Sequence, residues 1–361
     1  MSRKFLISVL LFCTLAVLTA VGISAAVVDS GFCGAEGDGS NLRWALTDDG
    51  TLTISGTGAM ADYTEIMQPD GVVVPTQPYM EYFTDITSIV VEPGVTHIGS
   101  YAFCTLYRAE SVSLPEGLVT IGRNAFDRCF GLTEITLPGT VNDSIMSIVF
   151  QNCYYLKNVY VADGNVYLKS IDGVLFRKSD NALVYFPIGR TDPVYRIPDG
   201  TESIIGGAFY KSQNLEEVII PDSVRGIYLN AFSDAKKLHS VYFEGNPPTA
   251  MVEDVFAGIS GLTLYYYEAY ADAWTSPTWT CPSGVVYNTV MIPALPGDFD
   301  GSGRVDADDV LIFSRYFARW PGYAENFDFM KADFNHDGSI TRADAMYFAR
   351  AVAGWPGYTL S

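Results

Sequence analysis

The chain is poor in histidine and in basic residues. Its 361 residues include 3 histidines, and 22 lysines and arginines stand against 41 aspartates and glutamates, for a formal net charge of -19. His97, His239 and His336 each stand alone in the sequence, and no HExxH sequence, nucleophile elbow or glycine-rich phosphate loop is present. These absences remove the usual signs of a zinc hydrolase, a serine hydrolase or a nucleotide-binding enzyme. The negative charge argues against nucleic acid and anionic membrane surfaces as partners.

Cysteine is also scarce. Of the 6 cysteines, Cys13 lies in the first apolar run, which leaves an odd number for the rest of the chain, without paired spacing. Such a set does not make a disulfide framework even in an exported protein. Cys129 and Cys153 each follow a repeated phenylalanine by three residues. We therefore expect both to be buried thiols of a repeat.

Only one long apolar run is present, at 5–21. It follows Arg3 and Lys4 and precedes the small residues Ser24-Ala25-Ala26, which is the pattern of a secretory signal peptide over 1–26. We expect a secreted, extracellular protein without stable membrane insertion after cleavage. A retained anchor is the alternative, because the run approaches the length of a membrane-spanning helix.

A period of about 23 residues dominates the middle of the chain. Several residue types keep this spacing together, among them the phenylalanines Phe103, Phe126, Phe150, Phe209, Phe232 and Phe256. In a unit such as LTEITLPGTV (132–141), apolar residues alternate before a proline, which ends the strand because it cannot donate a ladder hydrogen bond. One unit cannot bury both its strand face and its phenylalanine, whereas stacked units can, so we predict a solenoid.

The ends and the middle of this array have features of their own. Alternating runs at 42–46 and 52–54 flank Asp49-Gly50, which predicts a hairpin that caps the first repeat. Residues 163–193 interrupt the period with two apolar runs and predict an inserted hairpin, whereas the proline-containing segment 64–80 predicts a loop. The aromatic-rich stretch after 262 is expected to cap the far end. These columns and the hairpin at 30–60 resemble the BspA-like leucine-rich repeat proteins.

The outward strand positions are the candidate binding face of the solenoid. Side chains between the buried positions of each strand point away from the core and stack across repeats. Tyrosines beside carboxylates suit recognition of sugars or protein loops. A merely solvated strand face is the alternative. The candidate ligand-binding residues are Glu134, Thr136, Asn158, Tyr160, Glu217 and Tyr242.

The C-terminal region contains an Asp-rich segment twice, at an offset of 35. DFDGSGRVDADD (298–309) and DFNHDGSITRAD (333–344) place oxygen donors at the positions that a twelve-residue calcium loop requires, with glycine at the sharp turn. We therefore predict two calcium ions. The predicted ligands are Asp298, Asp300, Ser302, the Arg304 carbonyl, Asp306 and Asp309 in the first loop, and Asp333, Asn335, Asp337, the Ser339 carbonyl, Thr341 and Asp344 in the second.

The two loops resemble the dockerin family. Position 12 is aspartate rather than glutamate, no helical pattern precedes the first loop, and both copies end in Trp-Pro-Gly-Tyr, at 320–323 and 355–358. The resemblance implies a module that binds a cohesin module of a scaffoldin in a cellulosome-type complex. By the same resemblance, cohesin contacts fall on Ala307, Asp308, Ser314, Arg315 and Arg319 of the first copy, and on Arg342, Ala343, Ala349 and Arg350 of the second.

The expected fold class is α+β, a β-rich leucine-rich-repeat solenoid with an N-terminal capping hairpin, followed by a small all-α calcium-binding dockerin domain. The expected divisions are a signal peptide at 1–26, the solenoid at 29–288 with repeats at about 86–262, a linker at 289–296, and the dockerin domain at 297–361.

We expect a secreted, non-catalytic binding or adhesion protein. Its repeats would bind an unidentified protein or glycan, and its dockerin would attach it to a complex that degrades polysaccharides. The alternatives are a hydrolase or enzyme regulator in the same complex, since paired carboxylates are available among many acidic residues, and a cell-surface adhesin or spacer.

Overall fold

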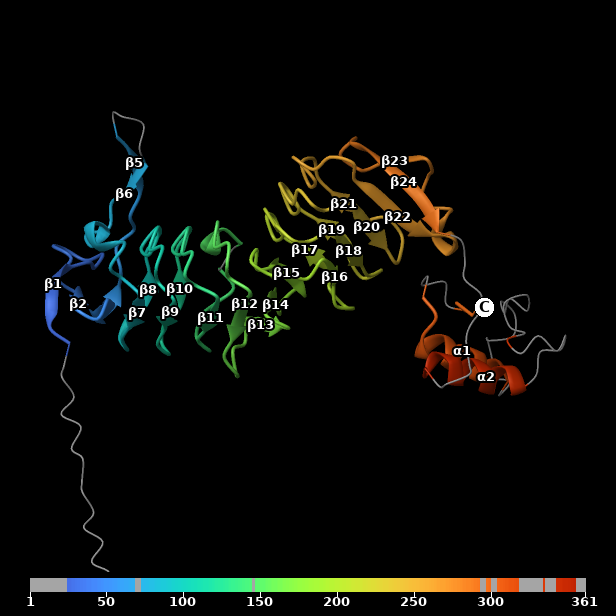
Figure 1. Ribbon diagram of the computed structural model, residues 1–361, viewed down its shortest axis with the longest axis horizontal. Helices are drawn as coiled ribbons and strands as arrows, with labels where there is room; N and C mark the ends of the chain where they lie inside the picture. Colours follow the sequence, from blue (N-terminus) through green and yellow to red (C-terminus); the bar gives the residue numbers. More distant parts are fainter. Residues whose placement is uncertain are drawn as a thin grey trace, which may run out of the picture.

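A computed structural model describes residues 25–68, 73–144, 147–292, 297–299, 304–317, 334 and 342–354. Outside these residues lie 1–24 of the predicted signal peptide, 293–296 of the predicted linker, 300–303 of the first calcium loop, most of the second calcium loop and both Trp-Pro-Gly-Tyr segments. Figure 1 shows an elongated, curved array of short strands that runs from β1 to β24, with helices α1 and α2 beyond its C-terminal end.

The solenoid begins with an antiparallel sheet that passes into parallel repeats. Strands β1 (Val27–Phe32), β2 (Leu42–Thr47) and β3 (Thr51–Gly56) are antiparallel, and β3 then pairs in parallel with β7 (Ser88–Val91), which pairs with β9 (Ser111–Ser113). The β2–β3 turn needs Gly50 at a φ of 83°. Asp49 Oδ1 steadies this turn by accepting a hydrogen bond from the Thr51 backbone N–H at 3.1 Å. The predicted capping hairpin is therefore present and gains β1 as a third strand.

Each repeat contributes a strand to one side of the array and a shorter extended segment to the other. The first half contains β11 (Glu134–Leu137) and β12 (Asn158–Val161) on one side, and β4 (Gly58–Ala59), β8 (Val95–Ile98) and β10 (Thr120–Ile121) on the other. The second half contains one sheet with the order β16 (Val194–Arg196), β18 (Glu217–Ile220), β20 (Ser240–Phe243), β22 (Thr263–Tyr267), β24 (Val286–Ile292) and β23 (Thr278–Thr280). Short 3-10 helices lie at Met80–Tyr82, Ser147–Phe150 and Glu268–Tyr270.

The inserted segment forms three strands. β13 (Leu168–Ile171), β14 (Val174–Arg177) and β15 (Ala182–Tyr185) are antiparallel, and β15 then pairs in parallel with β17 (Ser203–Ile204), followed by β19 (Gly226–Ile227) and β21 (Ala250–Met251). The segment therefore does not project from the array as an isolated hairpin. Its last strand continues the second ladder.

Repeated phenylalanines form a buried column along the core. Phe103, Phe126 and Phe150 follow one another at ring-centroid distances of 5.3 and 5.8 Å. The insertion supplies the rings that bridge its own interruption, because Tyr185 lies 5.5 Å from Phe150 and Phe186 lies 4.9 Å from Phe209. The column then continues through Phe232 and Phe256 at 4.6 and 5.1 Å. Buried apolar area of this kind is the main stabilising contribution to a stacked array.

The segment at 64–80 differs from the predicted loop. It contains the antiparallel strands β5 (Glu65–Met67) and β6 (Val73–Pro75), in which Ile66 pairs with Val74. Figure 1 shows this hairpin projecting from the first repeats. Its proline lies on a two-stranded edge, where a missing ladder donor is tolerated. The prediction of a loop was therefore wrong for the residues that form β5 and β6.

The C-terminal module contains helices α1 (Ala307–Phe317) and α2 (Arg342–Val352). Phe313, Phe334 and Phe348 are buried between them, with Phe299 packed against this cluster. Phe299 and Phe334 occupy the second position of the two loops, so the sequence duplication places equivalent rings in one small core. Among the described residues, no helix has the length and apolar composition needed to cross a bilayer.

Candidate functional site

The calcium-loop carboxylates that the structure describes are largely buried. Asp298, Asp309 and Asp344 are 2%, 0% and 0% exposed. Asp309, at the end of the first loop, accepts hydrogen bonds from the Phe299 backbone N–H at 2.6 Å and the Asp306 backbone N–H at 2.9 Å. These bonds fold the loop around its last carboxylate. Burial of several charged oxygens in so small a module is costly unless a cation compensates them.

The chemistry of this donor set fits a calcium ion. Calcium prefers six to eight hard oxygen ligands, and carboxylates at the two ends of one loop are its usual protein donors. The Arg304 carbonyl and the Asp306 carboxylate lie between these ends in sequence, and Asp306 Oδ1 also accepts a hydrogen bond from the Asp308 N–H at 2.9 Å, at the start of α1. The predicted ligands Asp300, Ser302, Asp333, Asn335, Asp337, Ser339 and Thr341 lie outside the described residues.

The predicted cohesin contacts fall on the two helices of the module. On α1, Ala307, Asp308 and Ser314 are exposed and Arg315 is half-buried. On α2, Ala349 and Arg350 are half-buried. Arg342 and Ala343 begin α2, but their side chains are not described, and Arg319 lies outside the described residues.

The six predicted ligand-binding residues of the strand face form two groups. Glu134 lies beside Asn158 and Thr136 beside Tyr160 in the β11–β12 pair, and all four are at least partly exposed. Glu217 and Tyr242 lie in the sheet that follows the insertion, where Tyr242 stacks on Tyr265 at 4.7 Å. Burial, and then the charge of Glu217, raise the pKa of Tyr242. The insertion separates the two groups into different sheets.

A buried ionic cluster lies where the β5–β6 hairpin meets the repeats, and sequence reasoning missed it. Glu65, Cys104 and Asp127 have ligand atoms within 4.8 Å of one another. Arg128 lies among them, in contact with Glu65 and with its Nη2 2.9 Å from Asp127 Oδ2. Burial raises the pKa of Asp127 and raises that of Cys104 to about 12. Because a guanidinium already compensates the carboxylates, we interpret this cluster as a structural anchor of the hairpin.

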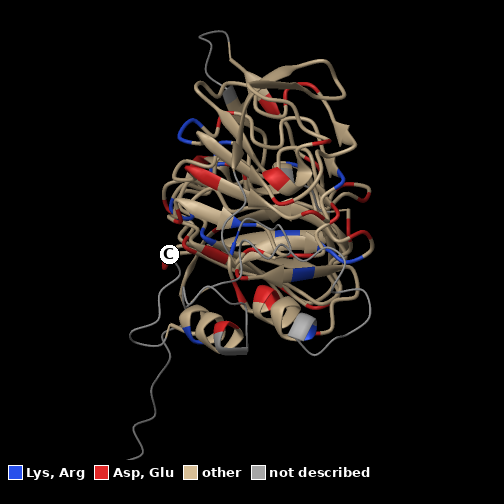
Figure 2. Ribbon diagram, turned by 90° about the vertical axis from the view of Figure 1, so that its right-hand side faces the viewer, with Lys and Arg blue, Asp and Glu red and all other residues tan. Residues whose placement is uncertain are grey.

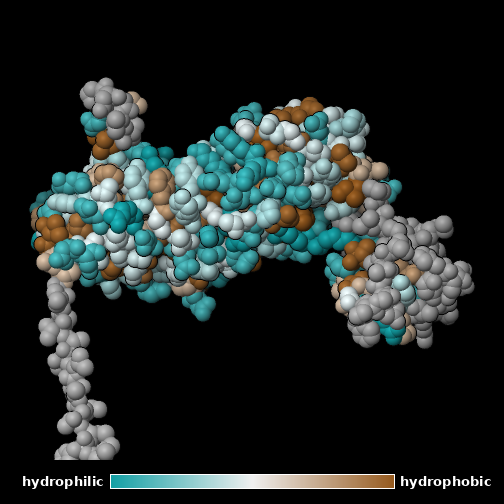
Figure 3. All heavy atoms as spheres, viewed as in Figure 1, coloured by the Kyte–Doolittle hydropathy of each residue, from teal (hydrophilic) through white to brown (hydrophobic). Residues whose placement is uncertain are grey.

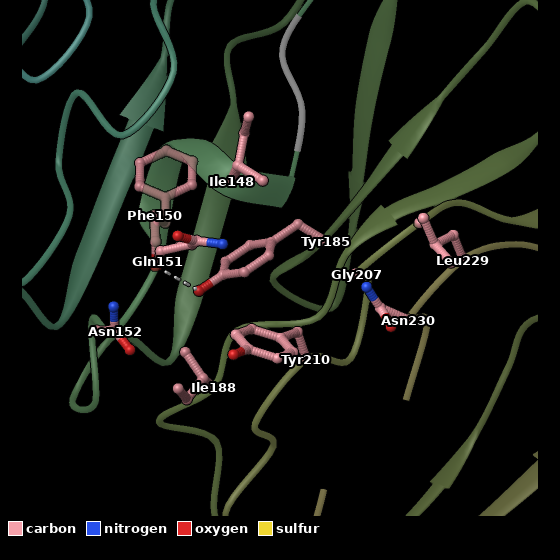
Figure 4. A pocket seen from close by; sticks show the side chains of 11 residues that line it. Ile148, Phe150, Gln151, Asn152, Tyr185, Ile188, Gly207, Tyr210, Leu229 and Asn230 are labelled. Atoms are coloured by element: carbon pink, nitrogen blue, oxygen red, sulfur yellow. Dashed lines mark hydrogen bonds between the residues drawn. The ribbon is translucent and has the colours of Figure 1, made fainter. Parts of the chain in front are cut away.

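The insertion also leaves a cleft beside the core column. This cavity of about 400 Å³ is lined by apolar and aromatic side chains, including Phe150, Tyr185, Ile188 and Tyr210. Figure 4 shows Tyr185 and Tyr210 among the side chains that line it, and the Tyr185 hydroxyl donates a hydrogen bond to the Phe150 carbonyl at 3.3 Å. No sequence signal identified this cleft, because its walls come from repeats that the insertion separates.

Exposed surfaces of the solenoid are polar and rich in acidic groups. Figure 3 shows hydrophilic residues over most of the repeat surface seen in that view, and Figure 2 shows acidic residues along the loops.

The cysteines Cys33, Cys104, Cys129, Cys153 and Cys281 are all buried free thiols, and Cys129 and Cys153 donate to the carbonyls of Phe103 and Phe126. The prediction that these two are buried thiols of the repeats is therefore confirmed.

The stacked repeats and the paired Asp-rich loops define a leucine-rich-repeat solenoid joined to a small helical module of the dockerin type. The chain belongs to the BspA type leucine rich repeat family, whose model matches 77–191 and 194–268 in 6 copies. The model of the dockerin type I domain matches 296–353. These two matches confirm both predicted family resemblances, and the solenoid with its small helical module confirms the predicted fold class. Dockerins are calcium-binding modules that dock onto cohesins.

Several solved structures of bacterial proteins are similar to this chain. A leucine-rich repeat protein from Eubacterium ventriosum is 20% identical, with a TM-score of 0.40 over 73% of this chain and 85% of that one. The pneumococcal vaccine antigen PcpA is 17% identical, with a TM-score of 0.33 over 73% of this chain and 100% of that one. A leucine-rich repeat protein from Bacteroides ovatus is 17% identical, with a TM-score of 0.33 over 70% and 77% of the two chains. No curated protein matches the chain.

Proposed function

We propose that the chain is a secreted, non-catalytic binding protein that a calcium-loaded dockerin attaches to a cohesin-bearing scaffold. The observation that carries this proposal is the presence, in one chain, of a repeat solenoid and a dockerin type I domain. The buried carboxylates Asp298, Asp309 and Asp344 support it, because they supply the charge that a bound cation requires. We assign two calcium ions, one to each of the duplicated loops.

The solenoid supplies the binding half of this function. A curved array presents the same strand positions in register across neighbouring repeats, and this provides an extended surface for a protein or a glycan. We assign this role to Glu134, Thr136, Asn158 and Tyr160 before the insertion, and to Glu217 and Tyr242 after it. Attachment to a polysaccharide-degrading complex would bring this surface to the complex's substrate or to a partner on it.

Binding of a cohesin panel by the full chain tests the docking half. We expect capture of at least one cohesin in calcium, loss of capture in EDTA, and loss of capture by Asp309→Ala. The matched control is Asp163→Asn, which removes one exposed solenoid carboxylate and should leave capture unchanged. Calcium-independent capture, or no capture by any cohesin of the panel, would contradict the docking assignment.

The non-catalytic part of the proposal has its own test. We expect no hydrolysis of a polysaccharide panel by the full chain. Activity that a single carboxylate substitution abolishes would support the hydrolase alternative, whereas cell binding by a chain that lacks cohesin capture would support the adhesin alternative.

A further inference from the structure

An aromatic ladder along one edge of the solenoid ends at Tyr154. Tyr107, Phe130 and Tyr154 come from successive repeats and stack with centroid distances of 5.0 and 5.7 Å and interplanar angles of 11° and 27°. The insertion interrupts this column, and the equivalent position of the next repeat is Gln213. Among the described residues, Phe130 is the ring partner of Tyr154. One face of Tyr154 is therefore covered by a ring and the other meets no ring.

A pocket lies at the end of this ladder. Its volume is about 490 Å³, within the range of small-molecule sites, and its lining residues are Tyr154, Lys211, Gln213, Asp234, Lys236 and Lys237. Lys236, Lys237 and Gln213 are exposed. The pocket thus combines the last ring of the ladder with three lysines and one aspartate.

The lysines that line the pocket outnumber its carboxylates by three to one. The ion pairs found among the described residues do not include Lys211, Lys236 or Lys237. Lys237 Nζ lies 3.4 Å from the side-chain carbonyl of Asn214, a neutral acceptor. In a chain with a net charge of -19, a single pocket lined by three ammonium groups and one carboxylate is a local positive exception. Such a group of cations favours an anionic ligand.

Asn152 holds the pocket wall in place. Its Oδ1 accepts hydrogen bonds from Lys211 Nζ at 3.1 Å and from the Tyr154 hydroxyl at 3.2 Å, while its Nδ2 donates to Asp127 at 2.8 Å. Asn152 and Lys211 occupy equivalent left-handed corners, with φ of 54° and 58°, in the repeats on either side of the insertion. This bond therefore spans the interruption and fixes the ring and the ammonium group relative to each other.

We propose that this pocket binds a uronic acid residue of an acidic polysaccharide. The apolar face of a pyranose ring packs on the Tyr154 ring where it lines the pocket, and the carboxylate of the sugar pairs with the ammonium groups of Lys236, Lys237 and Lys211. Gln213 supplies an amide for a ring hydroxyl. An acidic peptide offers carboxylates but no rigid ring to cover Tyr154, so the combination of groups favours the sugar. The inference names the ligand class of the solenoid and rests on the binding role proposed above.

The test is calorimetric titration of the full chain, in calcium, with trigalacturonate and with its fully methyl-esterified form. The two ligands share their rings and differ in charge, and short oligomers keep calcium from gelling the probe. We expect trigalacturonate to bind, the ester to bind at least about tenfold more weakly, and added salt to weaken binding of the acid form. Equal binding of both ligands would overturn the proposal.

Matched variants separate charge from stacking. Lys236→Gln combined with Lys237→Gln should weaken trigalacturonate binding about tenfold, whereas Lys157→Gln, at an exposed lysine outside the pocket, should not change it. Tyr154→Phe should retain binding, because it keeps the ring, and Tyr154→Leu should lose it. Tyr155→Leu removes the neighbouring exposed tyrosine and serves as the control. Thermal melts of each variant show whether the fold is retained.

The outcomes distinguish this inference from the docking function. Cohesin capture without trigalacturonate binding overturns the uronic acid site and leaves the docking function intact. Trigalacturonate binding without cohesin capture supports the site and contradicts docking. Binding of tetra-aspartate as tight as that of trigalacturonate would assign the pocket to acidic peptides and overturn the proposal.

Discussion

Arg304, in the first calcium loop, forms an ion pair with Glu244 of the solenoid, with 3.3 Å between Nε and Oε1. Glu244 is only 6% exposed and also contacts Arg196, a residue of β16. One buried carboxylate is thus shared by an arginine of the repeats and an arginine of the docking module. The backbone carbonyl of Arg304 is a predicted calcium ligand, so with calcium bound there this one residue would contact both the ion and the solenoid.

Replacement of this shared carboxylate should loosen the junction. Glu244→Gln leaves two arginines with a neutral partner, and we expect a loss of about 1–3 kcal/mol in the free energy of unfolding. Asp199→Asn is the control, because Asp199 is an exposed partner of Arg196 at 2.9 Å, and its removal should cost at most about 1 kcal/mol. Urea unfolding of both variants measures the difference. A Glu244→Gln chain as stable as the parent would show that the contact contributes nothing.

Removal of calcium should unfold the C-terminal module and leave the solenoid folded. A module of this size buries little core, and an ion that binds only the folded form adds its binding free energy to stability. We expect EDTA to abolish amide protection in 304–317 and 342–354 in hydrogen exchange, while the repeats stay protected. Equal protection with and without EDTA would contradict the ligand assignment.

The calcium ligands should differ in importance along the first loop. Asp309 is buried at position 12, where the ligand binds through both oxygens in the usual loop, whereas position 9 often binds through water. Asp309→Ala should therefore reduce calcium affinity more than Asp306→Ala, in a calcium titration followed by calorimetry. Asp309 also holds the loop by accepting hydrogen bonds from two backbone N–H groups. Asp309→Asn keeps the shape of the side chain and removes its charge, so it separates the effect of the charge from the effect of unfolding the loop.

The cysteines should be unreactive in the native protein. Burial raises the pKa of both Cys33 and Cys104 to about 12, so these thiols stay protonated at pH 8, where the reactive thiolate is scarce. Ellman's reagent should label few thiols in the folded chain and many more in guanidinium. Fast labelling under native conditions would indicate local opening of the repeats that hold them.

The ring supplied by the insertion should matter more than its hydroxyl. Tyr185 fills the gap in the phenylalanine column, so Tyr185→Ala should cost about 3–5 kcal/mol of the free energy of unfolding. Tyr185→Phe removes only the hydrogen bond to the Phe150 carbonyl and should cost about 1 kcal/mol. Chemical denaturation gives both values. Similar losses for the two variants would mean that the ring is not a required part of the column.

Repeats and calcium loops were accessible from the sequence because their signals are local. Phe103 and Phe126 each pack on a neighbour one repeat away, so a spacing in the sequence becomes a spacing in the core. The paired loops likewise place equivalent rings, Phe299 and Phe334, in one cluster. Such nearest-neighbour contacts repeat with the chain and need no knowledge of the whole fold. The exact domain boundaries and the ligand and cohesin residues remain predictions.

The contacts between segments that are distant in the sequence could be found only from the tertiary structure. The β5–β6 hairpin, its anchoring by Arg128, and the separation of Glu134 from Glu217 all depend on segments that meet only after folding. The same holds for the pocket at Tyr154, since the insertion decides which residues face the end of the aromatic ladder. The sequence by itself determined the repeating unit and the docking module, because periodic contacts are encoded within one unit. Only the tertiary structure decided what happens where the period is broken, because the partners there are distant in the chain.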